Sequence, residues 1–196
     1  MRNWIKVMVF IFVCVFSVMG QEKKAPALLN ALIGRSVSVE TDGGHGTGVV
    51  VIKGIVLTNF HLLNAGSGIK VDGKEATILK ADPKNDLLLL AADTAQVTPL
   101  VLALEITQDE EVIVVGNPLG HKRMISRGRV IDITESKIYI DAHIFLGSSG
   151  SGAFNADGAL IGIVVAIEGG EGDGFPFGIV IPALTIYKFF PKRLAQ

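Results

Sequence analysis

Short hydrophobic runs ended by Gly, Asp or Asn fill most of the sequence from Val37 onward. Runs of this length that are rich in Val, Ile and Leu are typical of β-strands. They fall into two groups of six. The first group predicts strands at Val37–Thr41, Gly48–Ile52, Ile55–Thr58, Ile69–Asp72, Glu75–Lys80 and Asp86–Ala92. The second group predicts strands at Glu111–Val115, Ile125–Ile133, Lys137–Asp141, Gly152–Asn155, Ala159–Ile167 and Phe177–Ile181.

The segments around these strands complete the expected architecture. Asp93–Glu110 contains Pro99 and no clear period, so it reads as a linker. Pro182–Leu194 has a helical pattern, with Pro182 suited to the first turn. Leu28–Ile33 is compatible with a short helix or with an N-terminal arm. We therefore expect an all-β fold of two six-stranded antiparallel β-barrels with a C-terminal helix. The expected divisions are barrel one at about 35–92, the linker at 93–110, barrel two at 111–181 and the helix at 182–194, all within one domain at 21–196.

The N-terminal segment has a different composition. A short basic region precedes the apolar run Val7–Met19, and polar residues follow Gly20. This pattern predicts a secretory signal peptide at 1–20, with Val18 and Gly20 at the −3 and −1 positions of the cleavage site. An uncleaved membrane anchor is the alternative, because a spanning helix needs about 20 apolar residues. We expect an exported protein, in the periplasm, the cell envelope or outside the cell, which contacts a membrane only if the segment is retained.

Charge and cysteine usage exclude several classes of function. The net charge is −1 and no basic stripe is present, so we expect no nucleic-acid partner. Cys14, the only cysteine, lies inside the apolar run, so the mature chain would have no disulfide and no thiolate site. The four histidines lack metal-ligand spacing, and we expect no metal and no cofactor. They are His45, His61, His121 and His143.

Three short polar segments interrupt the apolar runs: Thr58–His61, Asp82–Asp86 and Gly147–Gly152. Each is weak evidence alone, since a histidine, a turn carboxylate and a flexible polar loop all have ordinary structural explanations. A carboxylate at the start of a buried strand is nevertheless costly without partners. In an oxyanion hole, backbone N–H groups converge on the substrate carbonyl, and small residues such as those of Gly147–Gly152 leave space for this approach. Taken in order, a histidine, an aspartate and a serine follow the chain order of chymotrypsin-like barrels.

The sequence resembles the trypsin-like proteases of the HtrA/Deg group over roughly Val37 to Phe190, and more distantly the bacterial glutamyl endopeptidases. The matching stretches are Gly46–Val50, Val56–His61, Asp86–Leu90, Gly116–Gly120, Ser126–Val130, Asp141–Ile144, Gly158–Ile163 and Gly174–Pro182. In that family the nucleophile follows Gly-Xaa and precedes the glycine of Ile-Gly-Ile by thirteen residues. Counting back from Gly162 selects Ser149 over its neighbours Ser148 and Ser151.

The resemblance implies a role for each site residue. Ser149 would attack the scissile carbonyl, His61 would act as general base and then acid, and Asp86 would orient the imidazole. The backbone of Gly147, Ser148 and Ser149 would form the oxyanion hole, with the outer two N–H groups as donors. The implied substrate pocket is lined by His143, Ile144, Val164, Val165 and Ala166. Its apolar wall favours small or medium aliphatic P1 side chains, with His143 an unexplained polar neighbour.

The expected function is that of a serine endopeptidase acting on polypeptides, with cell-envelope protein quality control as the implied setting. The resemblance covers the protease domain alone, without the PDZ domain that HtrA proteases usually carry. Members of that family often form trimers, so a homo-oligomer is one outcome that the resemblance allows. The alternative function is that of a catalytically inactive protease fold used as a binding module.

Overall fold

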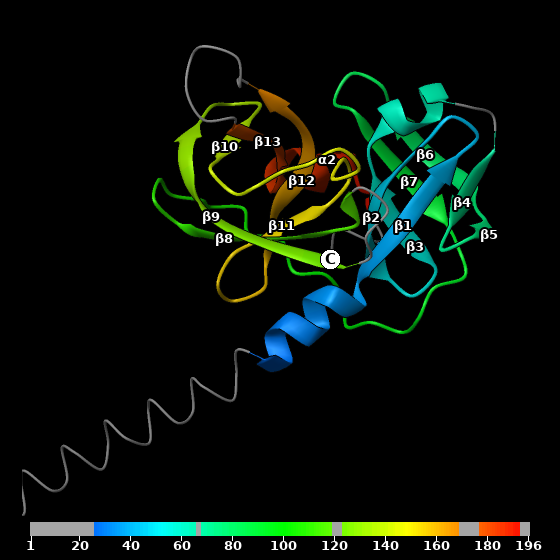
Figure 1. The fold of residues 1–196 in the computed structure, drawn as a ribbon, viewed down its shortest axis with the longest axis horizontal. Coiled ribbons are helices and arrows are strands. Elements are labelled where there is room, and N and C mark those ends of the chain that lie inside the picture. The colour runs from blue at the N-terminus through cyan, green and yellow to red at the C-terminus, as the bar shows by residue number, and fades with distance from the viewer. Residues whose placement is uncertain (1–25, 66–67, 119–122, 169–176, 193–196) are drawn as a thin grey trace, which may run out of the picture.

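The structure, a computed structural model, describes residues 26–65, 68–118, 123–168 and 177–192. Two β-sheet units lie beside each other, with a helix over residues 26–34 leading into the first (Figure 1). The predicted signal peptide, 1–20, lies outside the described residues. So do His121 and the last residues of the predicted C-terminal helix.

The first unit is an antiparallel sheet of seven strands in the order β5-β4-β1-β2-β3-β7-β6. Its strands are β1 (Ser36–Thr41), β2 (Gly44–Ile52), β3 (Ile55–Thr58), β4 (Ile69–Val71), β5 (Lys74–Glu75), β6 (Thr77–Asp82) and β7 (Leu87–Ala91). The sheet is open, whereas the sequence predicted a closed barrel of six strands. The seventh strand arises because the predicted strand Glu75–Lys80 is divided at Ala76, whose N–H donates to Ile69 O. The chain thus pairs with β4 before Ala76 and with β7 after it, at opposite edges of the sheet.

The second unit is a closed barrel of six antiparallel strands in the order β10-β13-β12-β11-β8-β9. Its strands are β8 (Glu111–Gly116), β9 (Met124–Ile133), β10 (Ile138–Ile140), β11 (Gly152–Phe154), β12 (Leu160–Glu168) and β13 (Phe177–Pro182). The expected all-β fold of the chymotrypsin-like type is confirmed, although the first unit is an open sheet of seven strands where a closed barrel of six was expected.

Three hydrophobic cores among the described residues explain the continuous apolar runs. One core fills the first unit and a second fills the closed barrel. A third joins the two units and includes residues of both, among them Leu57, Phe154 and Ile163. Along β7, Leu88 and Leu90 belong to the core of the first unit, while Leu87 and Leu89 belong to the joining core. Because both faces of this strand are buried, every position from 87 to 90 must be apolar.

The C-terminal helix, α2 (Ala183–Phe189), is shorter than predicted at both ends. Pro182 is its extended N-cap residue rather than part of the first turn. Phe190 is again extended, with φ −61° and ψ 142°. Its successor, Pro191, disfavours the helical conformation in the residue that precedes it, which ends the helix.

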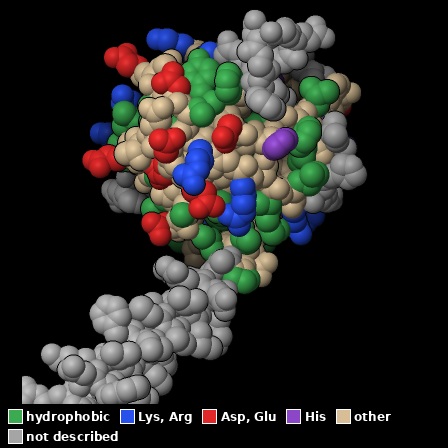
Figure 2. All heavy atoms as spheres, turned by 60° about the vertical axis from the view of Figure 1, so that its left-hand side comes forward, with side chains coloured by type: hydrophobic (Ala, Val, Ile, Leu, Met, Phe, Trp, Pro, Cys, Tyr) green, Lys and Arg blue, Asp and Glu red, His purple; other side chains and the backbone are tan. Residues whose placement is uncertain are grey.

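The surface carries charges of both signs. On the face turned forward in Figure 2, basic and acidic side chains are interspersed, and no broad field of one sign is visible. Within the described residues, none of the helices combines the length and the apolar character that crossing a membrane would require.

Candidate active site

His61 lies at the edge of the first unit, directly after β3. That strand ends at Thr58, whose hydroxyl donates to Thr47 O at 2.6 Å and so ties the strand end to β2. The chain then turns into a short 3₁₀ helix, η1 (Phe60–Ala65), which carries His61. The imidazole is part-exposed, with 39% of the side-chain surface accessible. A strand end followed by one tight turn thus presents the ring at a rim, where a substrate could reach it.

Asp86 faces His61 from the loop before β7. The Nδ1 atom of His61 lies 2.8 Å from Asp86 Oδ2, and the His61 backbone N–H donates to Asp86 Oδ1 at 2.8 Å. An ionised carboxylate only accepts hydrogen bonds, so this contact assigns the proton of neutral His61 to Nδ1. The lone pair of Nε2 is then free to accept a proton.

The backbone of Asp86 adopts a left-handed conformation, with φ 53°. Its carbonyl oxygen accepts hydrogen bonds from the Phe60 N–H at 3.2 Å and from Asn59 Nδ2 at 3.1 Å. A residue with a positive φ cannot continue a regular strand, so β7 begins at Leu87 and not at Asp86 as predicted. The turn directs the carboxylate toward the imidazole instead of along the strand.

The loop over residues 141–151, hereafter the Ser149 loop, connects β10 with β11. It contains a turn in which the Ser148 N–H donates to Phe145 O at 2.9 Å and the Phe145 N–H donates to Ser148 Oγ at 3.2 Å. Gly147 and Gly150 both have a positive φ, 88° and 84°. A Cβ atom on Gly150 would overlap Thr47 O, so only glycine fits there.

Thr47 on β2 holds the Ser149 loop against the first unit. Its hydroxyl donates to Gly147 O at 3.0 Å, and its N–H donates to Ser149 O at 2.8 Å. These bonds cross from one sheet unit to the other. They bring the predicted nucleophile beside the loop of His61 although the two are far apart in sequence.

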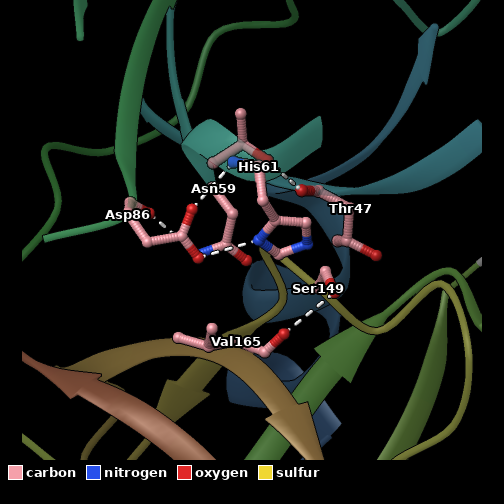
Figure 3. A network of polar contacts seen from close by, with 7 residues as sticks. Thr47, Asn59, His61, Asp86, Ser149 and Val165 are labelled. Carbon is pink, nitrogen blue, oxygen red and sulfur yellow. Dashed lines mark hydrogen bonds and ion pairs between the residues drawn. The ribbon is translucent and has the colours of Figure 1, made fainter. Parts of the chain in front are cut away.

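Ser149 is the most accessible of the three candidate serines. Ser148 is 4% exposed and Ser151 is 0% exposed, whereas Ser149 is part-buried. The hydroxyl of Ser149 donates to Val165 O at 3.0 Å. Among the described residues no hydrogen bond joins Ser149 to His61. In the view of Figure 3, Ser149 lies on the side of the imidazole away from Asp86.

The N–H groups of Gly147 and Ser149 have no acceptor within the described part of the chain. The N–H of Ser148, between them, is occupied by Phe145 O. The sequence predicted these two N–H groups, of Gly147 and Ser149, as the donors of an oxyanion hole. They flank the N–H of Ser148, which is already paired.

The predicted pocket residues differ in their burial and in the groups that they contact. Val164 is buried inside the closed barrel, and Val165 contributes its carbonyl group to Ser149. The backbone of Ala166 pairs with Ile179 on β13. Ile144 packs closely on Gly178, because a Cβ atom there would lie 2.7 Å from Ile144 Cγ1. His143 is exposed and lines a separate cavity with Ser148.

Sequence reasoning did not single out Thr47, Asn59 or Gly178 as parts of the site. Each lies within a stretch that resembles the HtrA/Deg proteases. A polar residue among apolar ones, for Thr47 and Asn59, and a single glycine in an apolar run, for Gly178, are the sequence signals that could have marked them. In the described part of the chain, no group of three His, Cys, Asp or Glu side chains is arranged to hold a metal ion.

A closed barrel beside an open antiparallel sheet is the fold of the chymotrypsin-like class, and in this chain it brings a histidine–aspartate contact close to Ser149. The chain belongs to the family described as "Trypsin-like peptidase domain", whose profile matches residues 46–163.

The curated relatives are periplasmic proteases. The chain is 31% identical to the periplasmic serine endoprotease DegP of Salmonella typhimurium over 70% of its length and 33% of the relative. It is also 31% identical to the periplasmic pH-dependent serine endoprotease DegQ of Escherichia coli, over 71% of its length and 35% of the relative. The chain thus spans about a third of the length of these relatives.

Solved structures support the fold. The Rv3671c protease in an inactive form has a TM-score of 0.71 and 24% identity, covering 83% of this chain and 90% of that chain. An inactive form of a serine-to-alanine variant of Rv3671c from Mycobacterium tuberculosis H37Rv has a TM-score of 0.70, again with 24% identity, covering 83% of this chain and 87% of that chain. At this identity the likeness concerns the fold alone.

Proposed function

We propose that the chain is a serine endopeptidase with His61, Asp86 and Ser149 as its triad. The observation that carries the proposal is the 2.8 Å contact between His61 Nδ1 and Asp86 Oδ2, with Ser149 on the other side of the ring (Figure 3). Because Asp86 fixes the proton on Nδ1, His61 can use Nε2 as a general base.

The reaction requires one rotation of the Ser149 side chain. Its hydroxyl leaves Val165 O and turns toward His61 Nε2. His61 then takes the hydroxyl proton as Ser149 Oγ attacks the carbonyl carbon of the substrate, and returns that proton to the leaving amine. The acyl group remains on Ser149 until a water, deprotonated by His61, hydrolyses the ester.

The N–H groups of Gly147 and Ser149 would stabilise the oxyanion of both tetrahedral intermediates. They need no rearrangement to become donors, since neither donates to another described residue. Losing one such donor in a comparable site costs about a hundredfold to a thousandfold in rate.

The P1 side chain would enter next to Gly178, where Ile144 supplies an apolar wall. Because Ile144 lies close to Gly178, the pocket has little room for a long side chain. We therefore propose small or medium aliphatic P1 residues. This pocket and the oxyanion donors belong to the proposal together with the triad.

The proposal also covers the export of the chain and the removal of its N-terminal segment. The relatives carry the word periplasmic in their names, which supports an exported protein. We propose that residues 1–20 act as the export signal and that 21–196 form the protease domain. Polypeptides of the cell envelope would be the substrates.

A fluorophosphonate probe tests the proposal directly. We expect covalent labelling of the full chain at Ser149, located by peptide mass spectrometry, and no labelling of Ser149→Ala. Casein cleavage should fall by up to about 10⁶-fold in Ser149→Ala. Ser151→Ala should retain substantial cleavage, because that hydroxyl is buried. Failure of a folded chain to react with the probe at neutral pH would instead favour a binding module without catalysis.

A further inference from the structure

The hydroxyl of Thr47 forms hydrogen bonds to backbone groups of two other segments. Thr47, drawn beside Ser149 in Figure 3, lies on β2 and is 0% exposed. Its hydroxyl accepts a hydrogen bond from the Asn117 N–H at 2.8 Å and donates one to Gly147 O at 3.0 Å. It therefore connects the first sheet unit with two parts of the second: the residue that follows β8 and the Ser149 loop.

The direction of the Thr47 hydroxyl proton follows from these two contacts. A backbone N–H can only donate, so the hydroxyl oxygen must be the acceptor toward Asn117. The single hydroxyl proton is then available for Gly147 O, which receives no other hydrogen bond from the described residues. Thr47 and Asn117 are both buried, so bulk water has little access to this arrangement.

The bond to Gly147 O fixes the orientation of the peptide group that joins Gly147 to Ser148. In a planar trans peptide the C=O and the N–H point in opposite directions. Thr47 binds the C=O of this peptide, and its N–H, which belongs to Ser148, donates to Phe145 O at 2.9 Å. Rotating this peptide would therefore break two hydrogen bonds at once.

Gly147 needs such a contact because its own backbone does not restrict it. A glycine adopts many conformations, and Gly147 has a φ of 88°. The other carbonyl groups of the segment are held as well, since Ser148 O accepts the Ser151 N–H at 2.9 Å and Ser149 O accepts the Thr47 N–H at 2.8 Å. The Thr47 hydroxyl supplies the corresponding contact for Gly147, where local restriction is weakest.

We propose that Thr47 is a positioning residue for the oxyanion hole. Its hydroxyl fixes the conformation of Gly147 and, through it, the direction of the Gly147 N–H toward the substrate carbonyl. Thr47 acts only through Gly147, because a fully buried side chain cannot contact the substrate. This inference rests on the proposed function, which makes the Gly147 N–H an oxyanion donor.

The position of the Gly147 N–H affects kcat more than KM. A donor that is already directed at the developing oxyanion needs no reorganisation during the reaction, which is why preorganised donors accelerate acyl transfer. The negative charge on the carbonyl oxygen develops in the transition state and is absent from the bound substrate. An interaction that is stronger in the transition state raises kcat without tightening substrate binding.

Substitution of Thr47 by valine tests the proposal, because valine has the same shape but neither donates nor accepts a hydrogen bond. We expect Thr47→Val to lower kcat about a hundredfold, the smaller effect of losing one oxyanion donor, and to change KM by less than about threefold. Thr47→Ser keeps the hydroxyl and should restore most of the activity. Steady-state peptidase kinetics on the full chain provide the measurement.

Thr134→Val is the matched control. The Thr134 hydroxyl also accepts from a backbone N–H and donates to a backbone carbonyl, both of Lys137, at 3.0 and 3.1 Å. Thr134 lies between β9 and β10, outside the candidate site, so kcat and KM should not change. An equal fall of kcat in both valine variants, or a Thr47→Val variant as active as the unmodified chain, would overturn the proposal.

Amide hydrogen exchange tests the structural part without any need for activity. It is measured on the full chain carrying Ser149→Ala, with and without Thr47→Val. The Ser148 N–H should exchange about tenfold faster when the Thr47 hydroxyl is absent, because its peptide loses one of the two bonds that hold it. The buried Val130 N–H, which donates to Glu110 O at 3.0 Å in the second unit, is the reference that reveals a global loss of stability.

The two measurements separate this inference from the proposed function. Unchanged exchange of the Ser148 N–H relative to the Val130 N–H would refute the role of Thr47, whatever the kinetics show. If that exchange is faster but the chain with Ser149 intact neither cleaves peptides nor reacts with the fluorophosphonate, the proposed function fails and the hold of Thr47 on Gly147 stands. Thermal unfolding checks each variant, and if Thr47→Val does not fold, Thr47→Ala, which adds no atoms, decides.

Discussion

At the scale of single residues, Asp86 is the most constrained member of the candidate site. Its φ of 53° is uncommon for a residue other than glycine, although aspartate tolerates it better than most. Two donors, the Phe60 N–H and Asn59 Nδ2, hold its carbonyl oxygen. The direction of the carboxylate therefore depends on a buried asparagine that does not touch the substrate.

Asn59→Ala should lower kcat about tenfold with little change in KM, because the carboxylate of Asp86 would lose its fixed direction toward His61. Stability should fall by about 1–2 kcal/mol, the usual effect of losing a buried hydrogen bond. Steady-state kinetics and thermal unfolding measure the two effects. The split between kcat and KM separates positioning from simple destabilisation, since a loss of folded protein alone would be seen in thermal unfolding and would leave KM and the kcat of the folded fraction unchanged.

Asn85→Ala is the matched control for Asn59. Asn85 is exposed, and its side chain contacts Asp82 rather than Asp86. Equal losses of kcat in the two variants would argue against a positioning role of Asn59.

The Ile144–Gly178 contact makes a residue-scale prediction about specificity. Ile144→Ala should widen the proposed pocket and shift the preferred P1 residue from Val or Ala toward Leu or Phe. A change in kcat/KM of about tenfold for each methylene gained or lost is the range expected of apolar pockets. Competitive hydrolysis of a peptide library provides the measurement. A profile that stays unchanged would place the P1 side chain elsewhere.

At the scale of elements, Arg35 connects the linker to the first unit. It follows the helix over residues 26–34 and is 6% exposed. Its guanidinium donates to Val50 O at 3.0 Å, and to Thr98 O and Thr98 Oγ1 at 3.2 Å each. Burial lowers the pKa of Arg35, because the charged form loses hydration. The bonds to backbone carbonyls offset part of this cost.

Arg35→Ala should destabilise the protein by about 2–3 kcal/mol, since two carbonyl groups lose a charged donor. The linker around Thr98 should become more susceptible to proteolysis. Lys137→Ala, at an exposed position, serves as the control. Denaturant unfolding and limited proteolysis give the two readouts. If protease sensitivity at the linker matched that of the control, the role assigned to Arg35 would be wrong.

At the scale of the whole molecule, the joining core determines whether the two sheet units behave as one. It contains residues from β2, β3 and β7 on one side and from β8, β11, β12 and β13 on the other. Phe154 is its largest fully buried side chain, 1% exposed. The Thr47 bonds to the Ser149 loop cross the same boundary.

We expect a single cooperative unfolding transition, because the two units share this core. Phe154→Ala should lower the free energy of unfolding by about 3–5 kcal/mol and preserve the single transition. Calorimetry tests both points through the agreement of calorimetric and van't Hoff enthalpies. Two separate transitions in the unmodified chain would show that the units fold independently.

The strands were largely predictable because their signal is local. Both faces of β7 are buried, so an unbroken run of leucines marked it plainly, and Ile55–Thr58 was bounded by turn residues. The helix end at Phe190 and the division of a strand at Ala76 were missed. The first is due to the conformational limit set by Pro191, and the second to pairing with two different edges of one sheet.

Sequence by itself determined the strand runs, the glycine frame around Ser149 and the order of the three candidate catalytic residues. These features depend on residue type and on spacing along the chain, so they are present in the sequence before the chain folds. Only the tertiary structure decided that the Asp86 backbone turns left-handed, that the Ser149 hydroxyl rests on Val165 O, and that the Thr47 hydroxyl binds Gly147 O. The reason is physical: each of these features is set by atoms that are distant in sequence and meet only when the open sheet and the closed barrel pack together.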